Sequence, residues 1–287
     1  MFEWWYSDVQ LADGTTIVCT ASPQASLGFV PQLGDTPMAV ARIQLHENGV
    51  QRNEIATFPT AEFKGATDHC DIVAGPVTMQ GDLKTWRVKG TINGLGIDLT
   101  FEQEAMPFRP GSGYFFAGST ERFTGWFWAR PSFDRYVALA VQMQFRDRVT
   151  APLLWVYDLQ EKRELVRAFS YDELTLATGR TVEHPDPLHG EGYPSITVYD
   201  YRKGRANVRV RIDDQKVIAG FFVYDISNPA IQQFLKGVGY NGAYYTRRAS
   251  TAELILDLPD SGLQDRVTGS TLHELQEFYF PQYLLPR

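Results

Sequence analysis

The chain has 287 residues, of which 44% are hydrophobic and 21% are charged, a balance typical of a globular protein that buries a sizeable core. Its net charge is −7 and no run of lysine or arginine interleaves with aromatic residues, which argues against a nucleic-acid partner. No window approaches the ~18 consecutive apolar residues that cross a bilayer, so we expect no membrane insertion. The aromatic share of 13% favours a strand-rich architecture or an apolar ligand cavity.

The first predicted element is the aromatic segment Glu3-Trp4-Trp5-Tyr6. Burying one aromatic side chain stabilises a fold by roughly 1.5–3 kcal/mol, so these rings are costly to leave in water. Successive side chains of a strand point to opposite faces, and both faces of this segment would be aromatic. We therefore predict a structural strand that is buried on both sides. Because Glu3 and Asp8 interrupt the apolar stretch, we expect no signal peptide.

Period-two alternation of apolar and other residues dominates the rest of the chain. In Tyr136–Phe145, for example, Val137, Leu139 and Val141 alternate with alanine and glutamine. Further strands of this kind are predicted at Thr15–Thr20, Val40–Leu45, Trp86–Ile92, Ile97–Glu102, Leu153–Tyr157, Ile196–Tyr201, Asn207–Ile212, Val217–Tyr224, Glu253–Asp257 and Thr271–Phe280. Turn signals separate them at Asp13-Gly14, Asn48-Gly49, Asn93-Gly94, Lys203-Gly204, Asp213-Asp214 and Ser261-Gly262. This pattern predicts an all-β fold, an antiparallel barrel or sandwich.

One short helix is predicted, with Asn228 as its N-cap, Pro229 in the first helical position and Gly237 just after the last turn. The residues that follow, Gly237–Gly242, match the G-x-G-x-x-G pattern of dinucleotide-binding proteins. That fingerprint needs a strand before it and a helix after it, whereas here the helix comes first. We therefore predict a loop at a barrel mouth and no dinucleotide site.

A domain boundary is predicted near residues 120–130. Pro107–Gly113 is rich in proline and glycine and closes the first set of strands, and Arg130-Pro131-Ser132 opens the second. The sequence thus predicts an N-terminal β-domain over residues 1–122 and a C-terminal β-domain over residues 123–287.

Neither the cysteines nor the histidines form a motif with metal-ligand spacing. Cys19 and Cys70 are the two cysteines, and we predict a reduced pair in a cytoplasmic protein, with a disulfide between them left open. His184 and His189 flank a proline-kinked loop with Asp186 between them, but no third cluster supports a zinc site there. We expect no metal and no cofactor.

Three stretches resemble the AttH-like and hydroxyneurosporene-synthase-like family. The opening Glu3-Trp4-Trp5-Tyr6 is similar to its N-terminal signature. Pro107–Phe116, followed by Trp126 and Pro131, resembles the segment that joins its two domains, and Gly269–Glu274 resembles its closing strand. The three stretches lie near the two ends and in the middle of the sequence, so the resemblance extends over the chain.

This resemblance implies two lipocalin-like antiparallel β-barrels with few short helices. The family includes carotenoid hydratases, and its relatives include lipocalin-like pericyclases of polyketide and terpenoid biosynthesis. Many members carry a Gly-Tyr-His-Asp-His-x-Trp-Gly-like stretch early in the second domain. Residues 130–155 contain no histidine. Hydration that depends on that motif is therefore less favoured than cyclisation, in which the protein folds the substrate into a reactive shape.

Glu274, His273 and Tyr245 are the candidate catalytic residues. His273 and Glu274 are neighbours in a predicted strand, so at most one of them points inward. A glutamic acid inside an apolar barrel would have a raised pKa and could act as a general acid. The alternative is a carboxylate paired with Arg109 or another arginine in the core. Tyr245 could donate a hydrogen bond to a substrate carbonyl.

Aromatic side chains are the candidate substrate-binding residues. Their faces can stabilise developing positive charge by about 0.5–2 kcal/mol each, although most of these rings must belong to ordinary core. Trp126 and Trp128 share one face of a predicted strand, with Phe127 on the other. The predicted binding residues are Trp5, Trp126, Trp128, Tyr240 and Tyr244.

The sequence therefore predicts a protein that binds a lipophilic small molecule, as a monomer or homodimer. The favoured activity is cofactor-independent cyclisation or isomerisation of a polyene, polyketide or terpenoid intermediate of secondary metabolism, as in a Diels–Alderase. Hydration of a carbon–carbon double bond, as in carotenoid 1,2-hydratases, is the enzymatic alternative. A non-catalytic carrier of lipophilic ligands is the alternative from another class.

Overall fold

The computed structural model describes residues 5–11, 13–23, 37–66, 69–82, 84–102, 123–145, 150–169, 172–183, 192–222 and 242–279. They divide into two compact units, one built from the strands up to residue 102 and the other from the strands beginning at residue 123. In these ranges helical structure is confined to two 3₁₀ turns, η2 (Thr60–Glu62) and η4 (Pro259–Ser261). The all-β prediction is confirmed. The predicted helix and the segment before the predicted domain boundary at residue 123 lie outside the described ranges.

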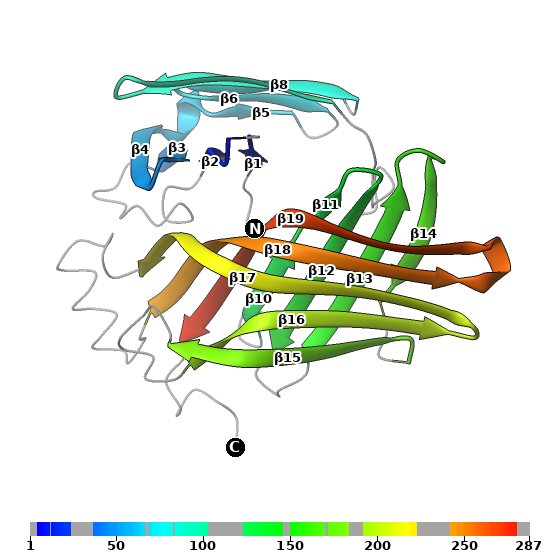
Figure 1. Cartoon of the computed structure of the whole chain (residues 1–287). Helices are drawn as coiled ribbons and strands as arrows, with labels where there is room; N and C mark the ends of the chain where they lie inside the picture. Colours follow the sequence, from blue (N-terminus) through cyan, green and yellow to red (C-terminus); the bar gives the residue numbers. More distant parts are fainter. Residues whose placement is uncertain are drawn as a thin grey trace. The chain divides into compact units, whose positions relative to one another are not determined.

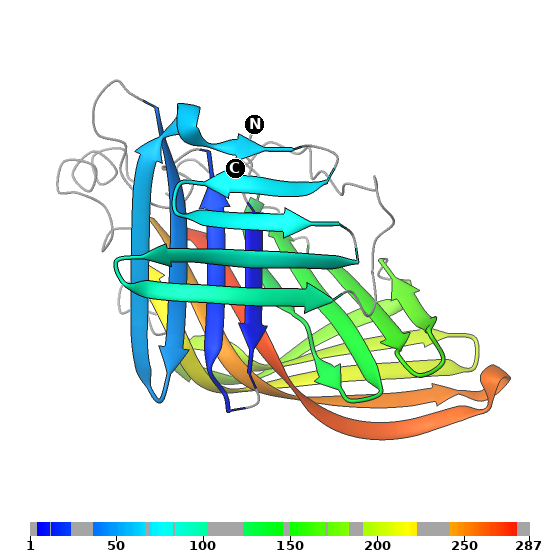
Figure 2. The same ribbon diagram turned by 90° about the horizontal axis from the view of Figure 1, so that it is seen from above.

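The first unit consists of two antiparallel sheets (Figure 1). One has the order β1-β2-β3-β4, with β1 (Trp5–Gln10), β2 (Thr16–Ser22), β3 (Met38–Glu47) and β4 (Val50–Pro59). The other has the order β5-β6-β7-β8-β9, with β5 (Lys64–Gly65), β6 (Cys70–Ala74), β7 (Val77–Gly81), β8 (Thr85–Ile92) and β9 (Leu95–Glu102). The strands of one sheet run across those of the other in Figure 2. Their facing side chains, among them Ile43, Ile72 and Val88, form one apolar core.

Two tight turns fix the register in this unit. Asn48 and Gly49, between β3 and β4, have φ values of 50° and 79°, and Asn93 and Gly94, between β8 and β9, have 47° and 80°. Positive φ at both central residues is the requirement of a type I′ hairpin turn, which asparagine and glycine tolerate best. Both predicted turns are confirmed.

The aromatic opening segment is described from Trp5 onward and forms β1, an edge strand paired with β2. Every side chain of β1 is half-buried, so the strand is partly covered on both faces and not fully buried as predicted. The reason is its position at the edge of the sheet. The Trp5 ring lies 5.1 Å from that of Phe63, centroid to centroid, and packs against the core of the first unit.

The second unit is one large antiparallel sheet with the order β14-β13-β12-β10-β19-β18-β17-β16-β15. Its strands are β10 (Phe123–Ala129), β11 (Ser132–Phe133), β12 (Tyr136–Phe145), β13 (Thr150–Asp158), β14 (Arg163–Ala168), β15 (Leu174–Glu183), β16 (Gly192–Lys203), β17 (Ala206–Phe222), β18 (Gly242–Leu258) and β19 (Leu263–Tyr279). The short β11 pairs with β12 and β19. Strands β13 and β15, near opposite ends of the sheet order, contact each other, so the sheet curls around its inner face. That face carries an apolar core that includes Leu154, Val210 and Leu254.

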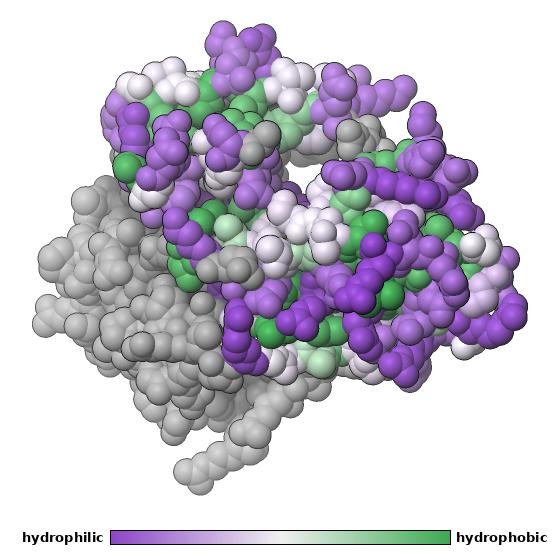
Figure 3. All heavy atoms as spheres, in the orientation of Figure 1, coloured by the Kyte–Doolittle hydropathy of each residue, from purple (hydrophilic) through white to green (hydrophobic). Residues whose placement is uncertain are grey.

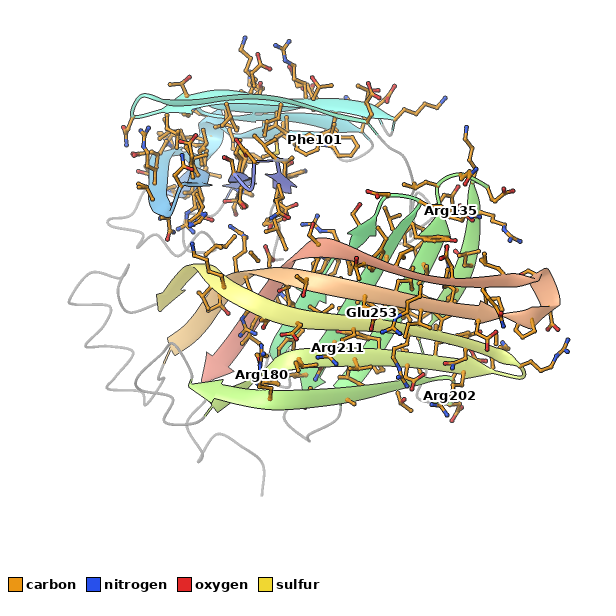
Figure 4. The ribbon with its side chains drawn as sticks, in the orientation of Figure 1. Phe101, Arg135, Arg180, Arg202, Arg211 and Glu253 are labelled. Carbon is orange, nitrogen blue, oxygen red and sulfur yellow. The ribbon has the colours of Figure 1, made fainter. Side chains whose placement is uncertain are left out.

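The outer face of strands β16–β18 is charged. Arg202, Arg211 and Glu253 are labelled along these strands in Figure 4, and hydrophilic residues cover much of this side of the unit in Figure 3. Exposed ion pairs such as Arg266–Glu253 link neighbouring strands, but pairs of this kind contribute only about 0–1 kcal/mol each.

One turn prediction is wrong. Asp213-Asp214 does not end a strand but lies inside β17, which joins the two segments predicted separately at Asn207–Ile212 and from Val217 onward. The pairing of β17 with β18 shifts register between Asp214 and Lys216, which marks a β-bulge just after this pair of aspartates. Asp214 is buried, and its carboxylate is satisfied by side chains of the neighbouring strands.

Candidate functional site

Asp214 is the centre of a buried polar cluster on β17, β18 and β19. Its Oδ1 lies 2.9 Å from Nδ1 of His273 and accepts a hydrogen bond of 2.7 Å from the Ser250 hydroxyl. Its Oδ2 lies 2.5 Å from Nη1 of Arg248. Arg248 is 0% and His273 1% exposed, so the cluster is shielded from bulk water. We call these four residues the Asp214 cluster.

The strand register explains why these side chains meet. Asp214 pairs with Ser250 across β17 and β18, and Arg248 pairs with His273 across β18 and β19. Alternate residues of a strand share a face, so Arg248 and Ser250 lie on the same side of β18 as the core residue Leu254. The Asp214 cluster therefore continues the inner face of the second unit beyond its apolar core.

The Asp214 carboxyl group stays ionised in this environment. Burial raises its pKa, but hydrogen bonding to His273 and Ser250 and the charges of His273 and Arg248 outweigh that effect and lower its pKa to about 2. An ionised carboxylate beside Nδ1 requires that nitrogen to carry a proton, which it donates to Asp214. Asp214 thus fixes the orientation and the tautomer of the imidazole, as a carboxylate does behind many functional histidines.

The other ring nitrogen of His273 is available for chemistry. Nε2 is buried and makes no hydrogen bond with any residue that the structure describes. The Phe127 ring, on the inner face of β10, has its centroid 5.5 Å from that of the imidazole. Gln142 pairs with Phe127 across β10 and β12, and its Oε1 is likewise buried without a partner within the described ranges. Two unsatisfied polar atoms therefore flank Phe127 on one face.

The cluster is not a serine nucleophile with its base. In a Ser-His-Asp triad the hydroxyl donates to the imidazole nitrogen that is not bonded to the carboxylate. Here the Ser250 hydroxyl donates to Oδ1 of Asp214, the same oxygen that lies against Nδ1 of His273. Asp214 instead holds the imidazole in place. Its Nε2, which has no partner among the described residues, can exchange a hydrogen bond or a proton with a bound molecule.

Glu274 lies on the opposite face of β19, as alternation requires, and yet it is also buried. Nε and Nη2 of Arg247 donate to its Oε1 at 3.2 and 3.1 Å. The pairing with an arginine is therefore the observed arrangement, and the partner is Arg247. Arg109, the partner named from the sequence, lies outside the described residues. A carboxylate that accepts hydrogen bonds from a guanidinium is poorly arranged to give a proton to a substrate.

The predicted aromatic residues fall in different places. Trp126 and Trp128 share the face of β10 opposite to Phe127, and both are half-buried. Trp128 packs against a small cluster formed by Leu139, Val141 and Trp155. Trp5 belongs to the first unit. Tyr244 and Tyr245 lie in β18 but their side chains are outside the described set, as is the whole of Tyr240.

The described residues contain no metal-ligand cluster, no disulfide and no membrane-spanning helix. In the part of the chain that the structure describes, no three His, Cys, Asp or Glu side chains gather as a metal site would require. Both cysteines are free thiols, and burial raises the pKa of Cys19 to about 12. No helix among the described residues has the length and apolar character needed to span a bilayer.

The sequence predicts His273 as a candidate residue but does not point to its three partners in the Asp214 cluster. The signal for Arg248 was present, because Arg248, Ser250, Ala252, Leu254 and Leu256 follow one another with a period of two. An arginine in register with buried leucines must itself be buried, and a buried arginine needs a carboxylate. The adjacent aspartates Asp213 and Asp214 are typical of a turn. That pattern does not indicate that Asp214 is the buried carboxylate that pairs with Arg248.

Comparison with known proteins supports the fold. No family model matches the chain, and neither does any curated protein sequence. Among solved structures, a protein of Nitrosomonas europaea assigned as AttH superposes with a TM-score of 0.50 at 13% identity, over 95% of this chain and 91% of that one. CghA in a structure with Sch210972 superposes with a TM-score of 0.53 at 10% identity, over 96% of this chain and 87% of that one. These neighbours share the fold that the sequence resemblance implied.

Proposed function

We propose that the protein is a cofactor-independent cyclase or isomerase, of the Diels–Alderase-like kind, that acts on a lipophilic polyene, polyketide or terpenoid intermediate of secondary metabolism. The observation that carries the proposal is the fold shared with CghA, whose structure holds Sch210972, over 96% of this chain and 87% of that one. Holding a flexible substrate in a reactive shape removes most of the entropic barrier to such a reaction, so few polar groups are needed.

The Asp214 cluster supplies polar groups of the expected kind. His273 is oriented by Asp214 and surrounded by buried side chains, and its Nε2 has no partner among the described residues. A hydrogen bond to a substrate is strongest where water is excluded and the protein group is already positioned. We infer that such a bond orients one end of the substrate and biases its electronics, while apolar contacts hold the rest.

The alternative activity, hydration of a carbon–carbon double bond, has less support. It would need a buried acid that can release a proton, and the buried Glu274 instead accepts hydrogen bonds from Arg247. A carrier would need no catalytic group at all.

One comparison separates the three activities. The gene is deleted in its source organism, and the metabolites that accumulate are identified by liquid chromatography and mass spectrometry. The purified protein is then added to the accumulated compound. A product of the same mass, formed faster than in buffer, supports the cyclase or isomerase. A product heavier by one water molecule identifies a hydratase, and binding without conversion identifies a carrier. Either of the last two results overturns the proposal.

A further inference from the structure

We infer that the inner face of the second unit, at His273 and Gln142, binds the hydroxyl or enol end of the lipophilic molecule. The site consists of Nε2 of His273 and Oε1 of Gln142, with the Phe127 ring between them. This inference rests on the proposed function and adds the chemical group that the ligand must present.

Both unpartnered atoms are hydrogen-bond acceptors. The proton on Nδ1 of His273 is committed to Asp214, so the ring in its neutral form presents a lone pair at Nε2. Oε1 of Gln142 is an amide oxygen, which can only accept. His273 is 1% and Gln142 6% exposed, so neither atom is satisfied by bulk water. A buried acceptor without a donor is costly, and a ligand O–H group removes that cost for the one acceptor to which it donates.

The register places both acceptors on the same face of the sheet. On β10, Phe127 pairs with Gln142 and Ala129 pairs with His273. Strand β10 thus lies between the strands that carry the two acceptors, and their positions are offset by two residues along it. Both lie on the face that carries Phe127 and Leu275. The Phe127 ring, whose centroid lies 5.5 Å from that of the imidazole, offers an apolar contact to the carbon atoms next to the hydroxyl.

Charge in the cluster favours a hydroxyl or an enol over an amine. Arg248 and Asp214 form an ion pair, so the cluster with a neutral His273 has no net charge. A cationic ligand would add a buried charge with nothing to compensate it. An acidic O–H can donate to Nε2 or transfer its proton there. Transfer breaks the O–H bond and forms an N–H bond, and the resulting anion is paired with the imidazolium.

The test compares two probes that differ only in the donor. Retinol and retinyl methyl ether carry the same polyene, and their binding is followed by polyene fluorescence. The wild-type protein should bind retinol about tenfold more tightly than the ether, the equivalent of one hydrogen bond to a buried acceptor. His273→Asn keeps an N–H that can donate to Asp214 but removes the acceptor at Nε2. With Gln142→Leu added, neither acceptor remains, and this double variant should bind both probes with about equal affinity.

The control variant is Arg266→Gln, which removes only an exposed ion pair with Glu253 and should keep the tenfold preference. A second measurement is the ¹⁵N spectrum of labelled histidine, in which Nε2 of His273 should shift with retinol and not with the ether. If wild type binds both probes equally, or if the double variant keeps the preference, the inference is overturned while lipophilic binding stands. If neither probe binds wild type, the proposed function fails at its first step and the inference fails with it.

Discussion

At the scale of the residue, Asp214 links stability to pH. Its pKa is about 2 in the folded protein against an ordinary value of 3.8, so its contribution is complete above pH 4 and is lost as the pH falls through 2. The difference corresponds to about 2 kcal/mol of unfolding free energy. Between pH 5 and pH 2, wild type should therefore lose about 2 kcal/mol more than Asp214→Asn, as measured by urea unfolding. Parallel curves for the two proteins would contradict this prediction.

The tyrosines of the second unit offer a matched pair. The Tyr199 hydroxyl is buried with no partner in the described part of the chain, whereas the Tyr136 hydroxyl donates to Asp265 at 2.8 Å. Tyr199→Phe should leave stability unchanged or raise it by about 1 kcal/mol, because it removes a buried polar group that makes no bond. Tyr136→Phe should lower stability by about 1 kcal/mol. Thermal unfolding of both variants checks this difference, and a Tyr199→Phe loss as large as that of Tyr136→Phe would show a partner for Tyr199.

The buried pair of Arg247 and Glu274 is expected to be structural. Glu274→Gln leaves a buried guanidinium without its carboxylate and should cost about 3–5 kcal/mol of unfolding free energy. Replacing both residues, with Arg247→Met and Glu274→Gln together, should recover most of that loss. If the double variant is as unstable as the single one, the loss comes from Glu274 contacts other than Arg247.

At the scale of the element, two glycines test how closely strands approach. A Cβ on Gly269 of β19 would lie 1.9 Å from the carbonyl oxygen of Ser132 on β11, whereas one on Gly179 of β15 would have no neighbour nearer than 4.0 Å. Gly269→Ala should therefore cost about 3 kcal/mol, because backbone must move. Gly179→Ala should stabilise by up to about 1 kcal/mol through the unfolded state. Denaturant unfolding measures both, and equal effects would contradict the close approach of β11 and β19.

The elements were predictable to the extent that their signals are local. Alternation and the Asn-Gly turns depend on neighbouring residues, so the strand at Tyr136–Phe145 and the hairpin at Asn93-Gly94 could be predicted. The continuous β17 could not, because Asp214 is accommodated in mid-strand by Arg248, Ser250 and His273, which are distant in the sequence. The candidate site depends on the same long-range pairing, and for that reason the sequence predicts only His273 among the four residues of the Asp214 cluster.

At the scale of the whole molecule, the two units have separate apolar cores. Ile43 belongs to the core of the first unit and Leu254 to that of the second, and the two sets of core residues share no member. Each side chain is 0% exposed, so its replacement by alanine should cost about 2–5 kcal/mol in its own unit. Cores that do not overlap are expected to open as separate cooperative units.

Hydrogen exchange followed by mass spectrometry can locate the loss. Ile43→Ala should speed amide exchange in β1–β9 and leave β10–β19 close to wild type, and Leu254→Ala should do the reverse. The exchange rate of each peptide in a variant is compared with the rate of the same peptide in the wild-type protein. This comparison shows whether the change is confined to one unit. If either variant speeds exchange to the same degree in both sets of strands, the chain unfolds as one cooperative body. A ligand that binds at His273 should then slow exchange in the first unit as strongly as in the second, whereas with separate units its protection should be confined to β10–β19.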